Sequence, residues 1–482
     1  MTSRRVHLHR HAWETDGARL TAGVTAIQHQ LGVSAEFPPE AAAEAKSAAR
    51  NPRLPALDRT DIPFVTLDPA SSLDLDQALH LEHRDEGYRV HYAIADVAAF
   101  VTPGGALEAE TFKRGETLYG ADSRIPLHPK VLSEDAASLL PGQQRPALLW
   151  TLDLDASGEI SNAQVERARV RSTAKLSYEG LQRDFDAGTV DPMLALLKQI
   201  GQRRLELEAE RGGVSLPLPE QEIEVDSAGH WQLSYRTALD VETWNAQLSL
   251  LTGMAAAKLM LAHGTGLLRT LPPADERDLQ RLRRIAQGLG IAWPDGLSYP
   301  GFIRTIDPDR PEGAAVLVAA ARTLRGSDYV AFHGTRPEHA GHSAIAAPYA
   351  HVTAPLRRLA DRFAGEICLA ACAGTPVPDW VIARLDLLPQ VMRDAARRAS
   401  QYESALLDLL EASVLAEHVG RTFTATVISV DDRDPARGRI MVKRPAIEAR
   451  CISGHELPLG AEVAARLVTA DPATRSVAFE VA

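Results

Sequence analysis

The chain has 482 residues, of which 45% are hydrophobic and 24% charged, values typical of a soluble globular protein with several domains. No apolar stretch is long enough for a membrane-spanning helix, and the three cysteines form no CxxC pair, so we expect a reducing cytoplasm and no membrane contact. The net charge of −11 weighs against a nucleic-acid partner, because phosphates need facing Lys and Arg side chains, unless the acidic residues gather around metal ions.

Residues 1–61 are predicted to form a small helical domain. Apolar residues recur there at helical spacing, at Leu20, Val24, Ile27 and Leu31. Gly32 is the expected stop of this helix, and a second, alanine-rich helix is expected from Pro39 to Ala49. The basic first residues lack the apolar core of a secretion signal. Two interpretations remain open for this arm, a helix-turn-helix unit or an appendage that packs on the rest of the protein.

Residues 62–418 are predicted to form a central domain of mixed α/β structure, and residues 419–482 a small barrel. Two strands are expected in PFVTLDPASSLDLDQALHLEH and YRVHYAIADVAAFV, and a hairpin turn at Ala156–Gly158. After Ser177 the pattern is helical, and Pro389 is expected to break or kink the last helical stretch. The short strands from Thr422 onward are typical of an OB-type barrel. The predicted fold class is therefore α+β multidomain.

An acidic loop between the first two expected strands is the sharpest chemical feature. It contains Asp68, Asp74 and Asp76, followed by Gln77. Crowded carboxylates repel each other, and a hard divalent cation such as Mg²⁺ is the usual means of offsetting that cost. A solvated acidic turn is the plain alternative, whereas the EF-hand pattern lacks its glycine and closing glutamate. Apolar residues on both sides favour a loop that enters a core.

A second group of residues surrounds two arginines. Thr353 is expected to cap a helix whose first turn contains Pro355, with Arg357 and Arg358 beside that turn. Arginine beside a helix N-terminus is unfavourable unless an anion is present, and a phosphate would suit both groups. Surface salt bridges to Asp361 are the alternative. An acidic metal loop and a phosphate-gripping arginine in one chain indicate phosphodiester chemistry.

Together, these segments resemble the ribonuclease II family. Its catalytic RNB domain carries a DxxxxxDxDD loop and a later TSPIRKYxD-like segment, which read here as DPASSLDLDQ and TAPLRRLAD. The segments RGETLYGADSRIPLHPKVLSEDAASLLPGQQRPAL and TAKLSY are also similar to the family and stand in its order. The likeness covers roughly residues 62–418, and the terminal barrel is similar to the family's S1-type RNA-binding barrel.

The resemblance implies a monomeric, Mg²⁺-dependent exoribonuclease, with Mn²⁺ as a substitute, that hydrolyses single-stranded RNA from its 3′ end to nucleoside 5′-monophosphates. The RNA 3′ end would thread into the catalytic domain. Asp68, Asp74, Asp76 and Gln77 would surround the metal, and Asp74, Asp76 and Arg357 would be catalytic. The residues implied to contact RNA are Tyr119, Tyr178, Thr353, Arg357, Arg358 and Glu403. Taken alone, the two tyrosines would be read as core residues and Glu403 as part of a solvated helix face.

Several departures from the family pattern keep a second hypothesis open. Gln77 replaces the fourth carboxylate of the loop, so the number of metal ions is undetermined. The family's helical glutamate has no clear counterpart, since Asn245 and Gln247 stand nearby and Glu242 is off register. The aromatic residue opposite Tyr119 has only two candidates, Trp231 and Tyr235. The helical arm would replace two cold-shock barrels, which predicts a more open entrance that admits structured RNA. The alternative to an active enzyme is a catalytically impaired RNA-binding regulator.

Overall fold

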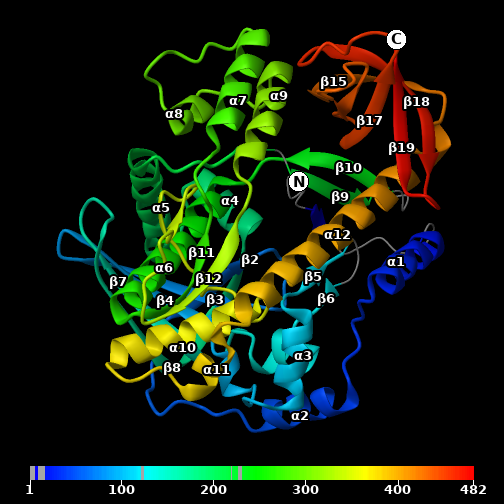
Figure 1. Cartoon of the computed structure of the whole chain (residues 1–482). Coiled ribbons are helices and arrows are strands. Elements are labelled where there is room, and N and C mark those ends of the chain that lie inside the picture. The colour runs from blue at the N-terminus through cyan, green and yellow to red at the C-terminus, as the bar shows by residue number, and fades with distance from the viewer. Residues whose placement is uncertain (1–5, 9–16, 121–123, 219, 226–230) are drawn as a thin grey trace.

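The computed structural model describes residues 6–8, 17–120, 124–218, 220–225 and 231–482. Two closed five-stranded barrels, one in the first half of the chain and one at its C-terminal end, are joined by a largely helical body (Figure 1). None of the described helices is both long and apolar enough to cross a membrane. The α+β multidomain prediction is confirmed.

The two segments expected to form strands contain three strands of the first barrel, because the acidic loop divides the first segment in two, and two further strands complete the barrel. In order around the barrel its strands are β2 (Phe64–Asp68), β3 (Gln77–Arg84), β4 (Gly87–Ala95), β7 (Gln144–Leu154) and β8 (Ile160–Ser177). Buried apolar side chains such as Leu79, Tyr92 and Trp150 belong to the main hydrophobic core beside it. The hairpin turn predicted at Ala156–Gly158 joins β7 to β8, and Gly158 adopts the left-handed backbone that such a turn favours. Since β2 and β8 run parallel, Asp68 and Ser177 end side by side at one rim.

Helices make up most of the body and provide most of its core. They are α3 (Ala106–Arg114), α4 (Tyr178–Ala187), α5 (Pro192–Arg211), α6 (Asp240–His263), α7 (Glu276–Gly288), α8 (Tyr299–Arg304), α9 (Pro311–Ala320), α10 (Leu359–Ala373), α11 (Asp379–Leu385) and α12 (Leu388–Leu415). Short helical turns are η1 (Val97–Ala99), η2 (Leu132–Ala136, π-helical), η3 (Ala321–Thr323) and η4 (Ala416–His418). Pro389 lies in the first turn of α12, directly after a break in the helical stretch, as predicted.

Small sheets complete the body. The parallel pair β1 (Val6–Leu8) and β9 (Glu220–Val225) is extended by β10 (Trp231–Arg236). The remaining two-stranded pairs are β5 (Leu118–Tyr119) with β6 (Arg124–Ile125), β11 (Thr265–Thr270) with β12 (Asp328–His333), and β13 (Gly341–His342) with β14 (Ala347–Pro348).

The two predicted N-terminal helices form, but each packs on a different part of the body. Helix α1 (Gly17–Leu31) packs on α12, with Val24 and Ile27 buried, and Gly32 follows it in the left-handed conformation. The side chain of Leu20 lies outside the described residues. Helix α2 (Pro39–Arg50) packs on α3 (Figure 1). Both helices of the arm thus contact helices of the body.

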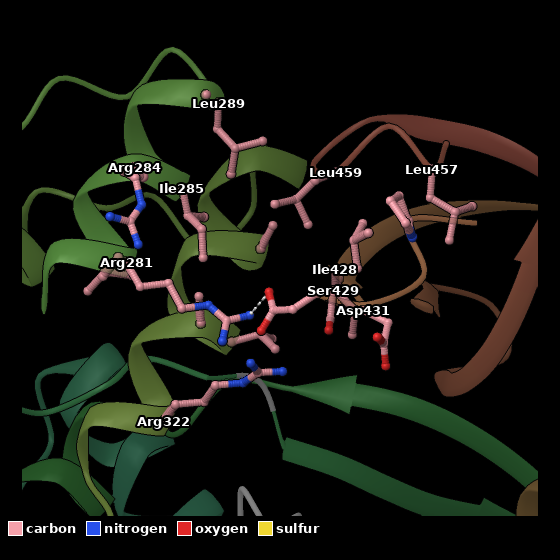
Figure 2. Close-up of a pocket in the computed structure, with 18 of the residues that line it drawn as sticks. Arg281, Arg284, Ile285, Leu289, Arg322, Ile428, Ser429, Asp431, Leu457 and Leu459 are labelled. Atoms are coloured by element: carbon pink, nitrogen blue, oxygen red, sulfur yellow. Dashed lines mark hydrogen bonds and ion pairs between the residues drawn. The ribbon is translucent and has the colours of Figure 1, made fainter. Parts of the chain in front are cut away.

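The terminal barrel confirms the predicted OB-type fold. Its strands are β15 (Thr422–Val430), β16 (Arg437–Val442), β17 (Ile447–Ser453), β18 (Glu462–Asp471) and β19 (Ser476–Val481). The long helix α12 runs from the body to this barrel (Figure 1), and Ile428 and Met441 pack against Ala314 of α9. A cleft of about 870 Å³ opens between α7, α9 and the barrel loops, and Figure 2 shows the Arg281–Asp432 ion pair, 2.7 Å long, that joins its two walls.

Candidate active site

The acidic loop, residues 69–76, connects β2 to β3, so Asp68 is the last residue of one strand and Gln77 the first of the next. Protein groups hold the loop along its length. Lys175 donates to two of its backbone carbonyls. The Ser138 hydroxyl donates to a third carbonyl (2.6 Å) and accepts from the amide of Leu75 (2.9 Å). These contacts differ from those of a freely solvated turn.

Asp74 forms an ion pair with an arginine that was not predicted from the sequence. Arg124 of β6 forms ion pairs with Asp74 and, at 2.9 Å, with Glu134 of η2. Arg124 is also the backbone partner of Tyr119 in the β5–β6 pair. The hairpin that carries Tyr119 is therefore fastened to the acidic loop.

Asp76 is the most deeply placed carboxylate of the loop, with 5% of its surface exposed. Burial raises the pKa of Asp76 well above its usual range, although the Arg357 cation and a hydrogen bond from the Leu356 amide (2.8 Å) act in the opposite direction. Burial also raises the pKa of Asp68 to about 7, where Arg357 again opposes and Asp74 adds to the shift. Both carboxyl groups would gain from a further cation nearby.

The predicted helix start at Thr353 is wrong, because α10 begins only at Leu359. Residues 353–358 form a turn in which two backbone amides donate to carboxylates, whereas the amides of Arg357 and Arg358 donate to the Ala354 carbonyl. The Ala354 amide donates to Asp361 (2.7 Å), and the Leu356 amide donates to Asp76 (2.8 Å). These two amides are therefore bonded to carboxylates, and an anion-binding helix terminus is not formed here.

The two neighbouring arginines of this turn have different surroundings. Arg358 donates two hydrogen bonds to Asp361, at 2.9 and 3.0 Å, so the salt-bridge alternative holds for this residue. The Arg357 side chain is 45% exposed, and its Nε lies 3.6 Å from a carboxylate oxygen of Asp76. Of the pair, Arg357 is the one placed to meet a phosphate beside the acidic loop.

Gln77 has partners at both ends of its amide. The side-chain nitrogen donates to the Thr353 carbonyl (2.6 Å), and the side-chain oxygen accepts from the Tyr92 hydroxyl (2.9 Å). The Tyr92 hydroxyl also lies 3.0 Å from Ser249 of α6. No pattern in the sequence predicted this chain of contacts.

The remaining predicted RNA-contacting residues lie on three elements. Tyr119 of β5 is 41% exposed, and Tyr178, the first residue of α4, accepts a hydrogen bond from buried Asn245 of α6 (3.2 Å). Glu403 is half-buried on α12, and its charge contributes to a raised pKa of Glu116. Glu116 was not predicted; burial is the main cause that raises its pKa to about 7.

The other candidates from the α6 region have structural partners. Gln247 donates to Glu208 (2.9 Å), and Glu242 pairs with Arg236 and accepts from the first amide before α6. Tyr235 packs against a cluster that includes residues of the terminal barrel. The side chain of Trp231 lies outside the described residues.

The donor set of the loop fits a hard divalent cation. Within the described part of the chain no group of three or more His, Cys, Asp or Glu side chains is arranged to hold a metal, so the predicted ligand set is not assembled as a closed cluster. Mg²⁺, however, keeps several waters and is commonly held by one or two carboxylates and substrate phosphates. Asp68 and Asp76 are suitable oxygen donors, because burial opposes their ionisation and a cation would favour it.

Comparison with known families matches two parts of the chain. The RNB domain pattern matches residues 57–370, and the pattern of the RNase II-type exonuclease C-terminal S1 domain matches residues 421–482. Ribonuclease R of Aquifex aeolicus is 27% identical over 387 residues, which are 76% of this chain and 53% of that protein. The chain thus spans about half the length of the curated relatives it matches.

Solved structures show the same fold. RNase R of Mycoplasma genitalium in complex with ribose-methylated single-stranded RNA superposes with a TM-score of 0.85 at 18% identity, covering 97% of this chain and 78% of that one. Yeast Ssd1, a pseudonuclease, superposes with a TM-score of 0.70 at 16% identity, covering 92% of this chain and 57% of that one. At these identities the likeness concerns the fold alone.

Proposed function

Because the chain belongs to the RNB family of exoribonucleases, we propose that it hydrolyses RNA from the 3′ end and releases nucleoside 5′-monophosphates. The observation that carries this proposal is the pairing of Asp76 with Arg357. A buried carboxylate and a half-exposed guanidinium, 3.6 Å apart, present a cation-binding oxygen and a phosphate-binding group at one place. Relatives named Ribonuclease R share this domain pattern.

Asp68 and Asp76 would hold a divalent cation, Mg²⁺ or Mn²⁺ in its place, with Asp74 beside them. Such a cation, when bound, polarises a phosphate oxygen and helps to neutralise the charge that develops there. Lys175 and Ser138 keep the loop in position before substrate arrives. Because these contacts are made by the protein itself, little reorganisation is needed when the phosphate binds.

Arg357 would grip the scissile phosphate, since its ion pair with Asp76 is long, at 3.6 Å, and 45% of its side chain is exposed. Tyr119 would stack on the terminal base, because its exposed ring stands on the hairpin fastened to the acidic loop. Tyr178 would line the same pocket, and Glu403 would approach the terminal nucleotide from α12. Thr353 and Arg358 would shape this pocket rather than bind RNA, since each is engaged by protein groups.

The direct test follows the fate of a 5′-labelled single-stranded RNA with and without Mg²⁺. We expect a ladder that shortens from the 3′ end in the wild type and is lost in the Asp76→Asn variant. Asp85→Asn is the matched control, because Asp85 lies in the β3–β4 turn with φ 51°, a conformation that Asn also adopts. Internal fragments in place of a ladder would contradict exonucleolytic cleavage.

The second candidate function is an RNA-binding regulator with impaired catalysis, and Gln77 is the observation that favours it. A pseudonuclease is among the proteins that share this fold. In the same experiment this alternative predicts intact RNA in every lane, with a gel shift that Mg²⁺ does not alter. Cleavage that requires Asp76 would exclude it.

The proposal also covers which RNA the enzyme digests and where in the cell it acts. An entrance shaped by the helical arm would admit structured RNA, so a hairpin with a 3′ overhang should be digested under conditions that digest single strands. If only the single strand is digested, the structured-RNA part of the proposal is wrong. We place the protein in a reducing cytoplasm, which agrees with its three free cysteines, and we propose that it acts as a monomer.

A further inference from the structure

Gln77 occupies the place where the family pattern has a fourth carboxylate. Its side chain bridges two segments of the chain through hydrogen bonds to Thr353 and Tyr92, and we call this bridge the clasp. The amide nitrogen donates to the Thr353 carbonyl at 2.6 Å, and the amide oxygen accepts from the Tyr92 hydroxyl at 2.9 Å. Tyr92 is 1% exposed, and its hydroxyl reaches Ser249 as well. One chain of hydrogen bonds thus joins α6, β4, β3 and the turn at 353–358.

Two adjacent residues hold that turn at two points. Asp76 accepts from the Leu356 amide, and Gln77 donates to the Thr353 carbonyl. The turn carries Arg357, so these contacts set the position of the guanidinium relative to Asp76. The Asp76 carboxylate contacts Arg357 and the turn and is proposed to bind a cation, whereas the Gln77 amide contacts the turn and Tyr92.

A carboxylate could not replace this amide without loss. The Thr353 carbonyl needs a donor, and an ionised side chain at position 77 would bring one acceptor against another in a buried place, since Thr353 is 3% exposed. Leaving a buried acceptor without its donor destabilises the folded state. The amide is therefore chemically matched to both of its partners.

We propose that Gln77 is a positioning residue that holds the Arg357-bearing turn against the acidic loop, and that it is not a ligand of the metal. The cation's protein ligands then come only from Asp68, Asp74 and Asp76. This inference rests on the proposed function for its effect on catalysis. Its structural part, the clasp, does not depend on whether RNA is cleaved.

Two variants of Gln77 separate a clasp from a ligand. Gln77→Met removes both hydrogen bonds at similar size, and we expect Mn²⁺ affinity, measured from the free-ion EPR signal, to stay within about twofold of wild type. RNA turnover, kcat, should fall about 10- to 100-fold, because misplaced groups cost this much. Gln77→Glu should also be slow, although it offers a better metal ligand. A tenfold loss of Mn²⁺ affinity in Gln77→Met, or full activity in Gln77→Glu, would overturn the proposal.

Tyr92 gives a conservative check on the same clasp. Tyr92→Phe should reduce kcat in the same direction, and the double variant with Gln77→Met should be little worse than Gln77→Met alone, because both act through one contact. Tyr88→Phe is the matched control on the same strand, since its hydroxyl contacts Gln199 instead. Additive losses in the double variant would contradict a shared role.

Hydrogen exchange provides a readout that needs no activity. The peptide covering residues 350–358 should exchange faster in Gln77→Met and Tyr92→Phe than in wild type and Tyr88→Phe. If the wild type does not cleave RNA, the proposed function fails, yet this measurement still tests the clasp. Unchanged exchange in both variants would refute it.

Discussion

Arg124 and Asp74 form an ion pair that ties the β5–β6 hairpin to the acidic loop. The same guanidinium lies 2.9 Å from Glu134, so one cation compensates two carboxylates whose side chains are each only 13% exposed. Arg124 faces Tyr119 across the hairpin. The surface proposed to stack on the terminal base and the loop proposed to hold the cation are therefore positioned by one side chain.

Replacing Arg124 should destabilise the protein strongly. Arg124→Gln removes the cation that pairs with both carboxylates. Glu134 keeps Lys130 at 3.7 Å, but Asp74 loses its ion-pair partner, and losing one partner of a largely buried pair costs about 3 kcal/mol. The free energy of unfolding, measured by urea denaturation, tests this. Arg466→Gln is the control, because its partner Glu480 is exposed and the loss should stay below about 1 kcal/mol. Equal losses in the two variants would mean that Arg124 acts as an ordinary surface residue.

The two arginines of the turn should respond differently to substitution by lysine. Arg357→Lys keeps the charge but loses the planar fork that grips a phosphate, so kcat should fall about 100-fold while the free energy of unfolding changes little. Arg358→Lys should instead reduce stability by about 1–3 kcal/mol, since two charge-assisted bonds to buried Asp361 are lost. Both RNA turnover and urea denaturation are measured for each variant. A loss of stability in Arg357→Lys together with a loss of kcat alone in Arg358→Lys would contradict these roles.

Glu116 should make stability depend on pH in an unusual direction. Burial raises the pKa of Glu116 from 4.5 to about 7, despite the opposing charges of Arg358 and Arg269. Between these values the folded protein keeps a proton that the unfolded chain has released, so the free energy of unfolding falls as pH rises through this window. In Glu116→Gln the decline should be smaller.

The measurement for Glu116 is urea denaturation at pH 5 and pH 7.5, with exposed Glu338→Gln as the control. Only the difference between wild type and Glu116→Gln is informative, since other buried carboxyl groups such as Asp68 titrate in the same direction. An unchanged pH dependence in Glu116→Gln would show that this carboxyl ionises normally in the folded protein.

Local patterns in the sequence predicted local structure well. Three carboxylates in one short segment identified the acidic loop, and Pro389 correctly indicated a helix boundary. Arg124 could not be found in this way, because its partner Asp74 stands 50 residues earlier and only the barrel brings them together. The helix start expected at Thr353 failed for the same reason, since contacts with distant residues, such as that of the Leu356 amide with Asp76, hold residues 353–358 in a turn.

Gly253 of α6 should tolerate no side chain, because α6 and the segment leading to the turn touch there. A Cβ at this position would lie 2.1 Å from the Tyr349 ring and 2.6 Å from the Ala350 carbonyl oxygen. The Ala350 amide also donates to the Gly253 carbonyl (3.1 Å), so the two segments cannot easily separate. Although alanine favours helix by about 1 kcal/mol, the overpacking should win, and Gly253→Ala should lose about 1–3 kcal/mol.

The matched control for Gly253 is Gly288→Ala at the end of α7, where an added Cβ would meet nothing within 4 Å. There the helical preference of alanine acts alone, and stability should rise by up to about 1 kcal/mol. Urea denaturation of both variants measures the contrast. Because Tyr349 precedes the turn that carries Arg357, Gly253→Ala should also slow RNA turnover, whereas Gly288→Ala should not. A Gly253→Ala variant as stable and active as wild type would show that α6 does not support the turn.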